Sequence, residues 1–302
     1  MRMRRRTIFL LSATATASAV VVWARARAHE RASRMAGRLR RNDAGAVHGA
    51  ESIALEGDGR GALLLLHGFG DTPQSLEWLA RNLNRAGWTV RVPLLPGHGA
   101  TLDAFRRSSR DAWLGAARAA LADLRATHRP VFVLGQSMGG ALATLLAAEH
   151  ADLPGLVLLA PYLGMPGRVR WAARSGRVWG VVAPWVVAAD VRSIRDPAER
   201  AASLAYGAVS PNLLAELFNV SEEARTAAPR VRAPVLVIFA RRDNRIPEAE
   251  AERGFAALGS REKWLVWLEE PGHVVSVDVG RERVFSLVEQ WIGRRGGRGG
   301  RR

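Results

Sequence analysis

The chain has 302 residues, with 44 Lys and Arg against 28 Asp and Glu, a formal net charge of +16 and no cysteine. Apolar residues make up 48% of the sequence, which is too many for an intrinsically disordered chain and enough to bury a large core. The absence of cysteine excludes disulfides, iron–sulfur clusters, cysteine-based zinc sites and a cysteine nucleophile.

The positive charge is concentrated at the two ends of the chain. Residues 1–41 hold eleven Arg and one acidic residue, and residues 294–302 hold five Arg and none. Residues 42–293 are close to neutral, so we expect no nucleic-acid partner, since a nucleic-acid enzyme carries its basic groove in the folded body. Two interpretations remain for the basic ends: solvated disordered segments, or segments attracted to anionic lipid headgroups.

An uncharged stretch of eighteen residues, 7–24, follows the first Arg cluster. As a helix it would span about 27 Å, just short of the hydrocarbon core of a bilayer. It fits an uncleaved anchor helix, a cleaved signal peptide or, because RRTIFL at 5–10 resembles that pattern, a twin-arginine signal. We therefore expect membrane association on an unassigned side, or export, in preference to a cytoplasmic location.

From residue 61 onward, short apolar runs alternate with longer amphipathic stretches, as in a parallel sheet buried on both faces. The expected strands are 62–66, 88–92, 131–134, 156–160, 235–240 and 264–268, with an edge strand at 52–55. The expected helices are 75–86, 112–126, 140–150, 248–258 and 282–292. This alternation predicts an α/β fold with a doubly wound, mostly parallel sheet.

About seventy residues separate the fourth and fifth of these apolar runs, far more than one crossover helix needs. We expect residues 164–233 to form an inserted helical cap. It contains Trp171, Trp179, Trp185 and a mostly apolar run at 181–189. These side chains either pack against the body or form an apolar lid over a pocket, and both can hold at once.

The expected domain organisation follows from these patterns. Residues 1–41 are an N-terminal anchor or signal segment with a basic linker, and residues 42–293 are one folded domain that carries the cap. Residues 294–302 are a basic, disordered tail.

The motif GQSMGG at 135–140 is the central chemical feature of the sequence. A buried strand precedes it and an Ala- and Leu-rich helix follows it, which is the context of a nucleophile elbow. Gly135 and Gly139 allow a cramped strand-to-helix turn that lifts the Ser137 hydroxyl to the edge of the sheet. The same turn aims the N–H groups of the helix N-terminus at developing negative charge.

A second glycine-rich segment, HGFG at 67–70, follows another buried strand. It places a flexible backbone beside the nucleophile, so the N–H groups of Phe69 and Met138 are the expected oxyanion donors. His67 stands before the nucleophile in the chain, in the wrong order to be its base. We expect His67 to hold this loop.

A serine nucleophile needs a base, and the base needs an acid that orients it. In this fold the order is Ser, then Asp or Glu, then His. His273 follows the last predicted strand and Asp243 follows the strand before it, and strand ends are where such sheets place their chemistry. Weaker candidates for the acid are Asp190, Asp196, Glu269 and Glu270.

These residues resemble the α/β-hydrolases of the bacterial carboxylesterase and monoacylglycerol lipase group, in the branch similar to serine aminopeptidases. The likeness covers about residues 60–292. Besides the two glycine-rich motifs, it rests on LPGHG at 95–99, PVLV at 234–237 and GHVVSVD at 272–278. The resemblance implies an α/β-hydrolase fold with Ser137 as nucleophile, Asp243 as acid, His273 as base, and Phe69 and Met138 as oxyanion donors.

We expect the chain to hydrolyse carboxylic esters, such as monoacylglycerols, through an acyl-enzyme that needs no metal or cofactor. Alternatives on the same fold are a lysophospholipase, a cofactor-free haloperoxidase, an acyltransferase and a peptidase. For the peptidase, Glu216, Glu222 or Glu223 could anchor the substrate amine. The alternative from another class is a non-catalytic, membrane-tethered binding protein that kept the fold.

Overall fold

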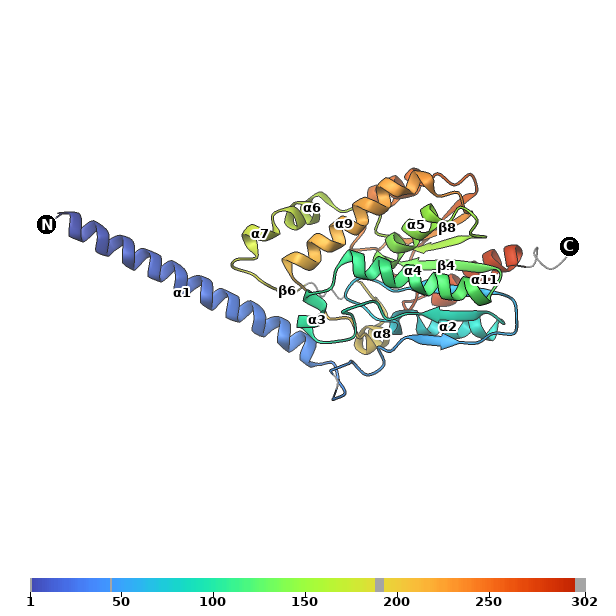
Figure 1. The fold of residues 1–302 in the computed structure, drawn as a ribbon, viewed down its shortest axis with the longest axis horizontal. Helices are drawn as coiled ribbons and strands as arrows, with labels where there is room; N and C mark the ends of the chain where they lie inside the picture. Colours follow the sequence, from blue (N-terminus) through green and yellow to red (C-terminus); the bar gives the residue numbers. More distant parts are fainter. Residues whose placement is uncertain (1, 44, 188–192, 297–302) are drawn as a thin grey trace.

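The computed structural model describes residues 2–43, 45–187 and 193–296 (Figure 1). The strands are β1 (Ile53–Leu55), β2 (Ala62–Leu66), β3 (Thr89–Val92), β4 (Val131–Gln136), β5 (Leu156–Leu159), β6 (Val186–Val187), β7 (Ala208–Val209), β8 (Val235–Ala240) and β9 (Lys263–Leu268). The helices are α1 (Arg2–Gly37), α2 (Gln74–Arg85), α3 (Leu102–Arg106), α4 (Arg110–Thr127), α5 (Met138–Glu149), α6 (Gly167–Arg174), α7 (Gly176–Trp179), α8 (Pro197–Ala202), α9 (Pro211–Ala227), the 3₁₀ turn η1 (Ala228–Arg230), α10 (Glu248–Ala257) and α11 (Arg281–Gly296).

Seven strands form one sheet in the order β1-β3-β2-β4-β5-β8-β9. Only β1 within this sheet is antiparallel to its neighbour, and the other pairings are parallel. The predicted doubly wound sheet is therefore confirmed, and the predicted runs become strands with ends that differ by a residue or two. The chain has an α/β-hydrolase fold.

Alternate residues of each central strand enter two separate cores, one on each face of the sheet. In β2, Leu64 and Leu66 pack with side chains of α4 and α5, while Leu63 and Leu65 pack with side chains of α2 and α11. A strand with helices on both faces has no exposed face, which explains why its sequence is continuously apolar rather than alternating.

The cap lies between β5 and β8, within the predicted limits 164–233, and consists of α6 to α9 with the short antiparallel strand pair β6–β7. Its longest helix, α9, packs on α5, the helix that follows the nucleophile motif. Of the three cap tryptophans, Trp185 is buried, Trp179 is half-buried and Trp171 is 70% exposed. The expected packing against the rest of the protein therefore holds for Trp185, and an apolar lid over a pocket stays a prediction. Positions 188–192 of the cap lie outside the described residues.

Helix α1 differs from the expected arrangement of anchor and linker. It is one helix as far as Gly37, and Ala32 and Ala36 near its end are fully or almost fully buried against the body. A domain boundary at residue 41 therefore separates the end of α1 from the body on which it packs. None of the helices in the described ranges combines the length and the apolar character needed to cross a membrane.

The C-terminal end also differs from the prediction. Helix α11 continues to Gly296, so the first three residues of the predicted basic tail are helical. Arg295 explains the extension, because its guanidinium lies over the rings of Trp291 and Trp264, at 4.2 Å and 4.9 Å from their centroids, and bonds Glu262. Residues 297–302 lie outside the described part.

Candidate active site

Ser137 sits at the sharp turn between β4 and α5. Its backbone has φ of 56° and ψ of −117°, a conformation that is strained for a residue with a side chain. The Ser137 N–H donates to Leu159 O at 2.9 Å, and the Ser137 carbonyl accepts from Gly140 N at 2.9 Å. The turn is thus held by backbone hydrogen bonds to the next strand and within its own helix.

The two elbow glycines are required by close approach of backbone. A Cβ on Gly135 would lie 2.1 Å from the carbonyl oxygen of Gly139. A Cβ on Gly139 would lie 2.0 Å from the carbonyl oxygen of Leu66 at the end of β2. Real Cβ atoms do not approach other atoms this closely, so both positions exclude any side chain, as the motif predicts.

The structure brings the three expected residues together from the ends of three strands. His273 Nε2 lies 2.8 Å from Ser137 Oγ, and His273 Nδ1 lies 2.8 Å from Asp243 Oδ2. Ser137 follows β4, Asp243 follows β8 and His273 follows β9, at the carboxyl edge of the sheet. Such an arrangement can remove the serine proton through the imidazole while the carboxylate holds the ring in one tautomer.

Asp243 is held as a carboxylate although its side chain is only 1% exposed. Burial alone would raise its pKa, but the charge and hydrogen bond of His273 and the backbone N–H groups of Ile246 and Arg245 together bring the pKa below its ordinary value. Those N–H groups donate to Oδ1 at 3.0 Å and 2.7 Å, which leaves Oδ2 for the imidazole. The other acids considered are not in this place: Glu269 and Glu270 are exposed, Asp196 caps α8, and Asp190 lies outside the described residues.

The expected oxyanion donors flank the nucleophile. Met138 is the first residue of α5, so its N–H has no carbonyl of a preceding helical turn to bond. On the other side, a Cβ built on Gly68 would lie 3.5 Å from Ser137 Cβ, which places the 67–70 loop directly against the serine. The Phe69 ring packs 5.3 Å from Phe105, centroid to centroid, and so anchors this loop.

His67 acts as the expected structural residue. It is fully buried, its Nδ1 donates to Gly68 O at 2.9 Å, and its Nε2 accepts from Leu95 N at 3.1 Å. Burial lowers its pKa to about 4, against the backbone bond to Gly68, which raises it. A neutral imidazole with both nitrogens in use ties the 67–70 loop to the segment 95–99.

Sequence reasoning gave no role to Asp278, which lies behind His273. Asp278 is 1% exposed and accepts N–H bonds from the His273 loop and from the end of the cap. The only signal in the sequence is its place in the motif at 272–278, where the spacing alone does not show what it binds.

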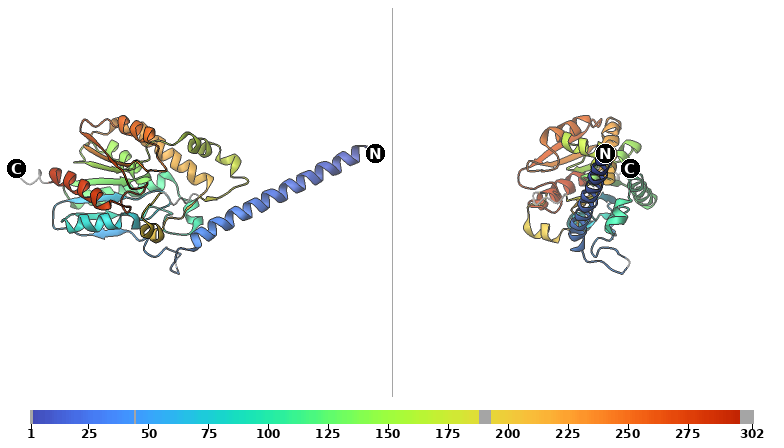
Figure 2. Two further views of the ribbon diagram at one scale, coloured as in Figure 1. Left: turned by 180° about the vertical axis from the view of Figure 1, so that it is seen from behind. Right: turned by 90° about the vertical axis from the view of Figure 1, so that its left-hand side faces the viewer.

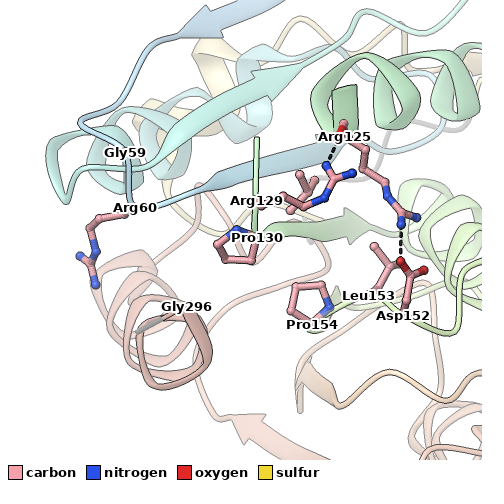
Figure 3. A pocket seen from close by; sticks show the side chains of 10 residues that line it. Gly59, Arg60, Arg125, Arg129, Pro130, Asp152, Leu153, Pro154 and Gly296 are labelled. Carbon is pink, nitrogen blue, oxygen red and sulfur yellow. Dashed lines mark hydrogen bonds and ion pairs between the residues drawn. The ribbon is translucent and has the colours of Figure 1, made fainter. Parts of the chain in front are cut away.

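A cavity of about 560 Å³ lies far from these residues. Its lining comes from segments that precede β2, β4 and β5 and from the end of α11 (Figure 3). Because Ser137 follows β4, the cavity lies at the opposite edge of the sheet. Arg125 in its wall pairs with Asp152, and Arg129 bonds backbone carbonyls. In the described part of the chain, no three His, Asp or Glu side chains are grouped to hold a metal ion.

The elbow, the Ser–His–Asp contacts and the fold define a serine hydrolase of the esterase and lipase class. Residues 57–279 match the serine aminopeptidase S33 family, and the chain belongs to this family. The three side chains of the site all come from one chain and are in direct contact.

Characterised proteins resemble this chain over most of its length. The thermostable monoacylglycerol lipase of Bacillus sp. (strain H-257) is 27% identical over 83% of this chain and 97% of its own. The carboxylesterase of Bacillus subtilis (strain 168) is 23% identical over 76% of this chain and 92% of its own. A solved structure from work on LipS and LipT, two metagenome-derived lipolytic enzymes, has a TM-score of 0.75 at 28% identity, covering 82% of this chain and 99% of its own.

The elbow geometry predicts different outcomes for two Gly→Ala substitutions. Gly139→Ala is expected to lower the free energy of unfolding by more than about 3 kcal/mol, because the new methyl group must displace the end of β2. Gly115→Ala is the control: nothing lies within 4 Å of the new Cβ, and in a helix interior it is expected to add up to about 1 kcal/mol. Urea denaturation measures both, and equal stabilities would contradict the close approach.

Asp71 lies beside the 67–70 loop, and we expect the stability of the wild type relative to Asp71→Asn to depend on pH. Burial raises its pKa to about 6, although hydrogen bonds from Ser75 and Thr72 and the charge of His273 lower it. A raised folded pKa favours folding only below the unfolded value, so relative to Asp71→Asn the wild type loses up to about 3 kcal/mol as pH rises from about 4 to above 6.

Urea unfolding of both proteins at the two ends of this pH range measures the difference. His67 and Asp243 titrate in both proteins, so their contributions cancel. A stability difference that is the same at both pH values would show that the Asp71 carboxyl does not titrate in this range.

Proposed function

We propose that the protein hydrolyses carboxylic esters through an acyl-enzyme formed on Ser137. The observation that carries the proposal is the pair of 2.8 Å contacts that link Ser137, His273 and Asp243 on a strained elbow. His273 takes the serine proton as Oγ attacks the ester carbonyl, and Asp243 stabilises the imidazolium that forms. His273 then protonates the leaving alcohol and activates water for deacylation.

The oxyanion of the tetrahedral intermediate is bound by the N–H groups of Phe69 and Met138. One lies on the 67–70 loop against Ser137, and the other is at the N-terminus of α5, whose dipole favours negative charge. No metal or cofactor takes part in this reaction.

An acyl ester such as a monoacylglycerol is the substrate class that we propose. The named relatives that act on acyl esters support it, as does a cap that places apolar side chains above the carboxyl edge of the sheet. In the cap, Trp185, Tyr206 and Leu213 are buried in the same core as Met138, the residue after the nucleophile.

The peptidase alternative receives less support from the cap carboxylates. Glu216 accepts from Arg110 N at 2.9 Å, Glu223 pairs with the Arg110 guanidinium at 2.8 Å, and Glu222 pairs with Arg225 at 2.7 Å. Each of the three therefore has a partner within the chain, which a substrate amine would have to displace at Glu216 and Glu223. Glu222 keeps one oxygen, Oε1, that is buried and has no hydrogen-bond partner among the described residues. An ester, which carries no such charge, needs no anchor of this kind.

Ser137→Ala tests the proposed function directly. Turnover of p-nitrophenyl esters from acetate to palmitate is expected to fall by at least about 10⁴-fold, because no other group supplies the nucleophile. The variant keeps a β-carbon at the strained position, so its thermal unfolding should match the wild type. Labelling by a fluorophosphonate should also disappear.

The controls for this experiment separate the alternatives. Turnover of amino-acid p-nitroanilides in preference to esters would favour the peptidase. Fluorophosphonate labelling without turnover of any ester would indicate an activated serine whose substrate is an acyl compound other than these esters. A wild-type protein that neither labels nor turns over any ester would contradict the hydrolase and favour the binding protein.

We also propose that the protein associates with anionic membrane surfaces through α1 and the tip of the cap, defined here as residues 167–187. Within the described side chains, almost all exposed large apolar residues lie on these two segments. They are Val20, Val22 and Trp23 on α1, and Trp171, Val178, Val181, Val182, Val186 and Val187 on the cap tip, with Trp264 elsewhere.

Charge and position support the same surface. The cap tip carries four Arg and no acidic residue, in a body that is otherwise close to neutral. Arg25 of α1 donates to the carbonyls of Gly180 and Val181, at 3.3 Å and 2.7 Å, so the helix lies beside the cap tip. Both project from the same side of the sheet (Figure 2). Exposed apolar side chains ringed by Arg are typical of a surface that binds anionic lipid.

A double charge reversal, Arg174→Glu with Arg177→Glu, tests this surface in the full chain. Binding to phosphatidylcholine vesicles with about 30% phosphatidylglycerol is expected to weaken at least about tenfold, at roughly 1 kcal/mol per basic residue. Arg81→Glu with Arg85→Glu, on the exposed side of α2, is the matched control and should bind as the wild type does. Equal binding of all three proteins, or no preference for anionic vesicles, would contradict the proposal.

A further inference from the structure

Asp278 joins the His273 loop to the returning end of the cap. Its Oδ2 accepts from Gly272 N, the residue before the base, at 2.6 Å. Both of its oxygens accept from Arg195 N at 2.9 Å, and Oδ1 also accepts from Asp196 N at 2.8 Å. One buried carboxylate therefore holds two segments that are more than seventy residues apart in the chain.

The same end of the cap is also bound to the loop that carries the acid. Ser193 Oγ donates to Asn244 Oδ1 at 3.1 Å and accepts from Arg245 Nε at 3.1 Å. Its carbonyl accepts from Val274 N, the residue after the base, at 3.0 Å. The segment 193–196, which we name the return segment, thus contacts the residues next to both Asp243 and His273.

The far side of the His273 loop has a separate anchor. Ser276 Oγ donates to Ser75 O at 2.6 Å, and Ser276 N donates to Gln136 Oε1, next to the nucleophile, at 3.3 Å. The imidazole therefore lies between an anchor on the elbow and an anchor on the return segment. If the second anchor is lost, the loop can pivot about the first, and His273 Nε2 moves away from Ser137 Oγ.

We propose that Asp278 is a positioning residue for His273 and that the return segment of the cap is the support through which it acts. The inference rests on the proposed function, because it assigns the support of the same base. The partners of the carboxylate within the described residues are backbone N–H groups, including Val279 N at 2.8 Å. An acceptor-only group fits this set of donors, and a carboxylate binds them more strongly than a neutral group.

An amide at this position cannot satisfy the same donors. In Asp278→Asn, the NH₂ group must face either Gly272 N or the N–H groups of the return segment, so one of the two links is replaced by a donor–donor contact. Ser109→Ala is the matched control. It removes the side chain that caps α4, away from the return segment and the His273 loop.

The experiment measures three quantities on the full chain: the rate of fluorophosphonate labelling, kcat and KM for p-nitrophenyl butyrate, and the low-field proton resonance of His273 Nδ1–H bonded to Asp243. In Asp278→Asn we expect the labelling rate and kcat to fall together by roughly 10- to 100-fold, the size of effect that misplacement of a catalytic group by about 1 Å produces. KM should change less than about twofold, and the resonance should broaden or shift. Ser109→Ala should lower the thermal midpoint and leave all three unchanged.

The proposal is overturned if the Asp278→Asn protein is less stable but keeps the wild-type labelling rate, kcat and His273 Nδ1–H resonance. If this variant does not fold, Ser193→Ala decides, since it cuts the link between the return segment and the Asp243 loop without leaving a buried charge unpaired. A slower labelling rate in Ser193→Ala supports the proposal, and a wild-type rate overturns it. A wild-type protein that fails to label contradicts the proposed function instead, so the two failures are distinguishable.

Discussion

The backbone of the nucleophile elbow touches the end of β2 so closely that no side chain fits between them, and this contact determines the rest of the site. With Gly139 against the Leu66 carbonyl, the serine has no relaxed conformation and projects from the sheet edge at a φ of 56°. The contact also brings the loop after β2 against Ser137, so one packing constraint places both Ser137 and the loop of Phe69, the proposed oxyanion donor. Preorganisation here comes from backbone, which cannot change rotamer.

Burial divides the ionisable groups around Ser137 into neutral and charged ones. His67 and His98 have lowered pKa values, chiefly because burial disfavours the imidazolium, so both are neutral. The His98 ring packs on His67 and Phe69 of the 67–70 loop, with centroids 5.0 Å and 6.4 Å apart. Asp243 is equally hidden but has two N–H donors and an imidazole, which favour the carboxylate. The negative charge that can stabilise a protonated His273 is therefore held beside its Nδ1.

The sheet and the three reacting side chains were predictable because each leaves a local signal. Continuous apolar runs mark strands covered on both faces, and residues placed just after such strands must meet at one edge. The ends of the chain were not predictable in this way. The glycine- and arginine-rich sequence around Arg295 predicts a disordered tail, whereas its contacts with Trp264, Trp291 and Glu262 hold it against the body. Ala32 and Ala36 are similarly buried by contacts that periodicity does not reveal.

The cap was predictable as an insertion but not as a support, because Asp278 acts through backbone N–H groups that any residue supplies. Its partners at positions 195, 196 and 272 therefore leave no trace in the sequence. The structure divides the cap into two parts with different constraints. The exposed tip around Trp171 and Val178 contacts little of the body, so its side chains can vary with the surface it meets. The return segment contacts the loops of both Asp243 and His273, so any change of the cap that moves it also moves the base.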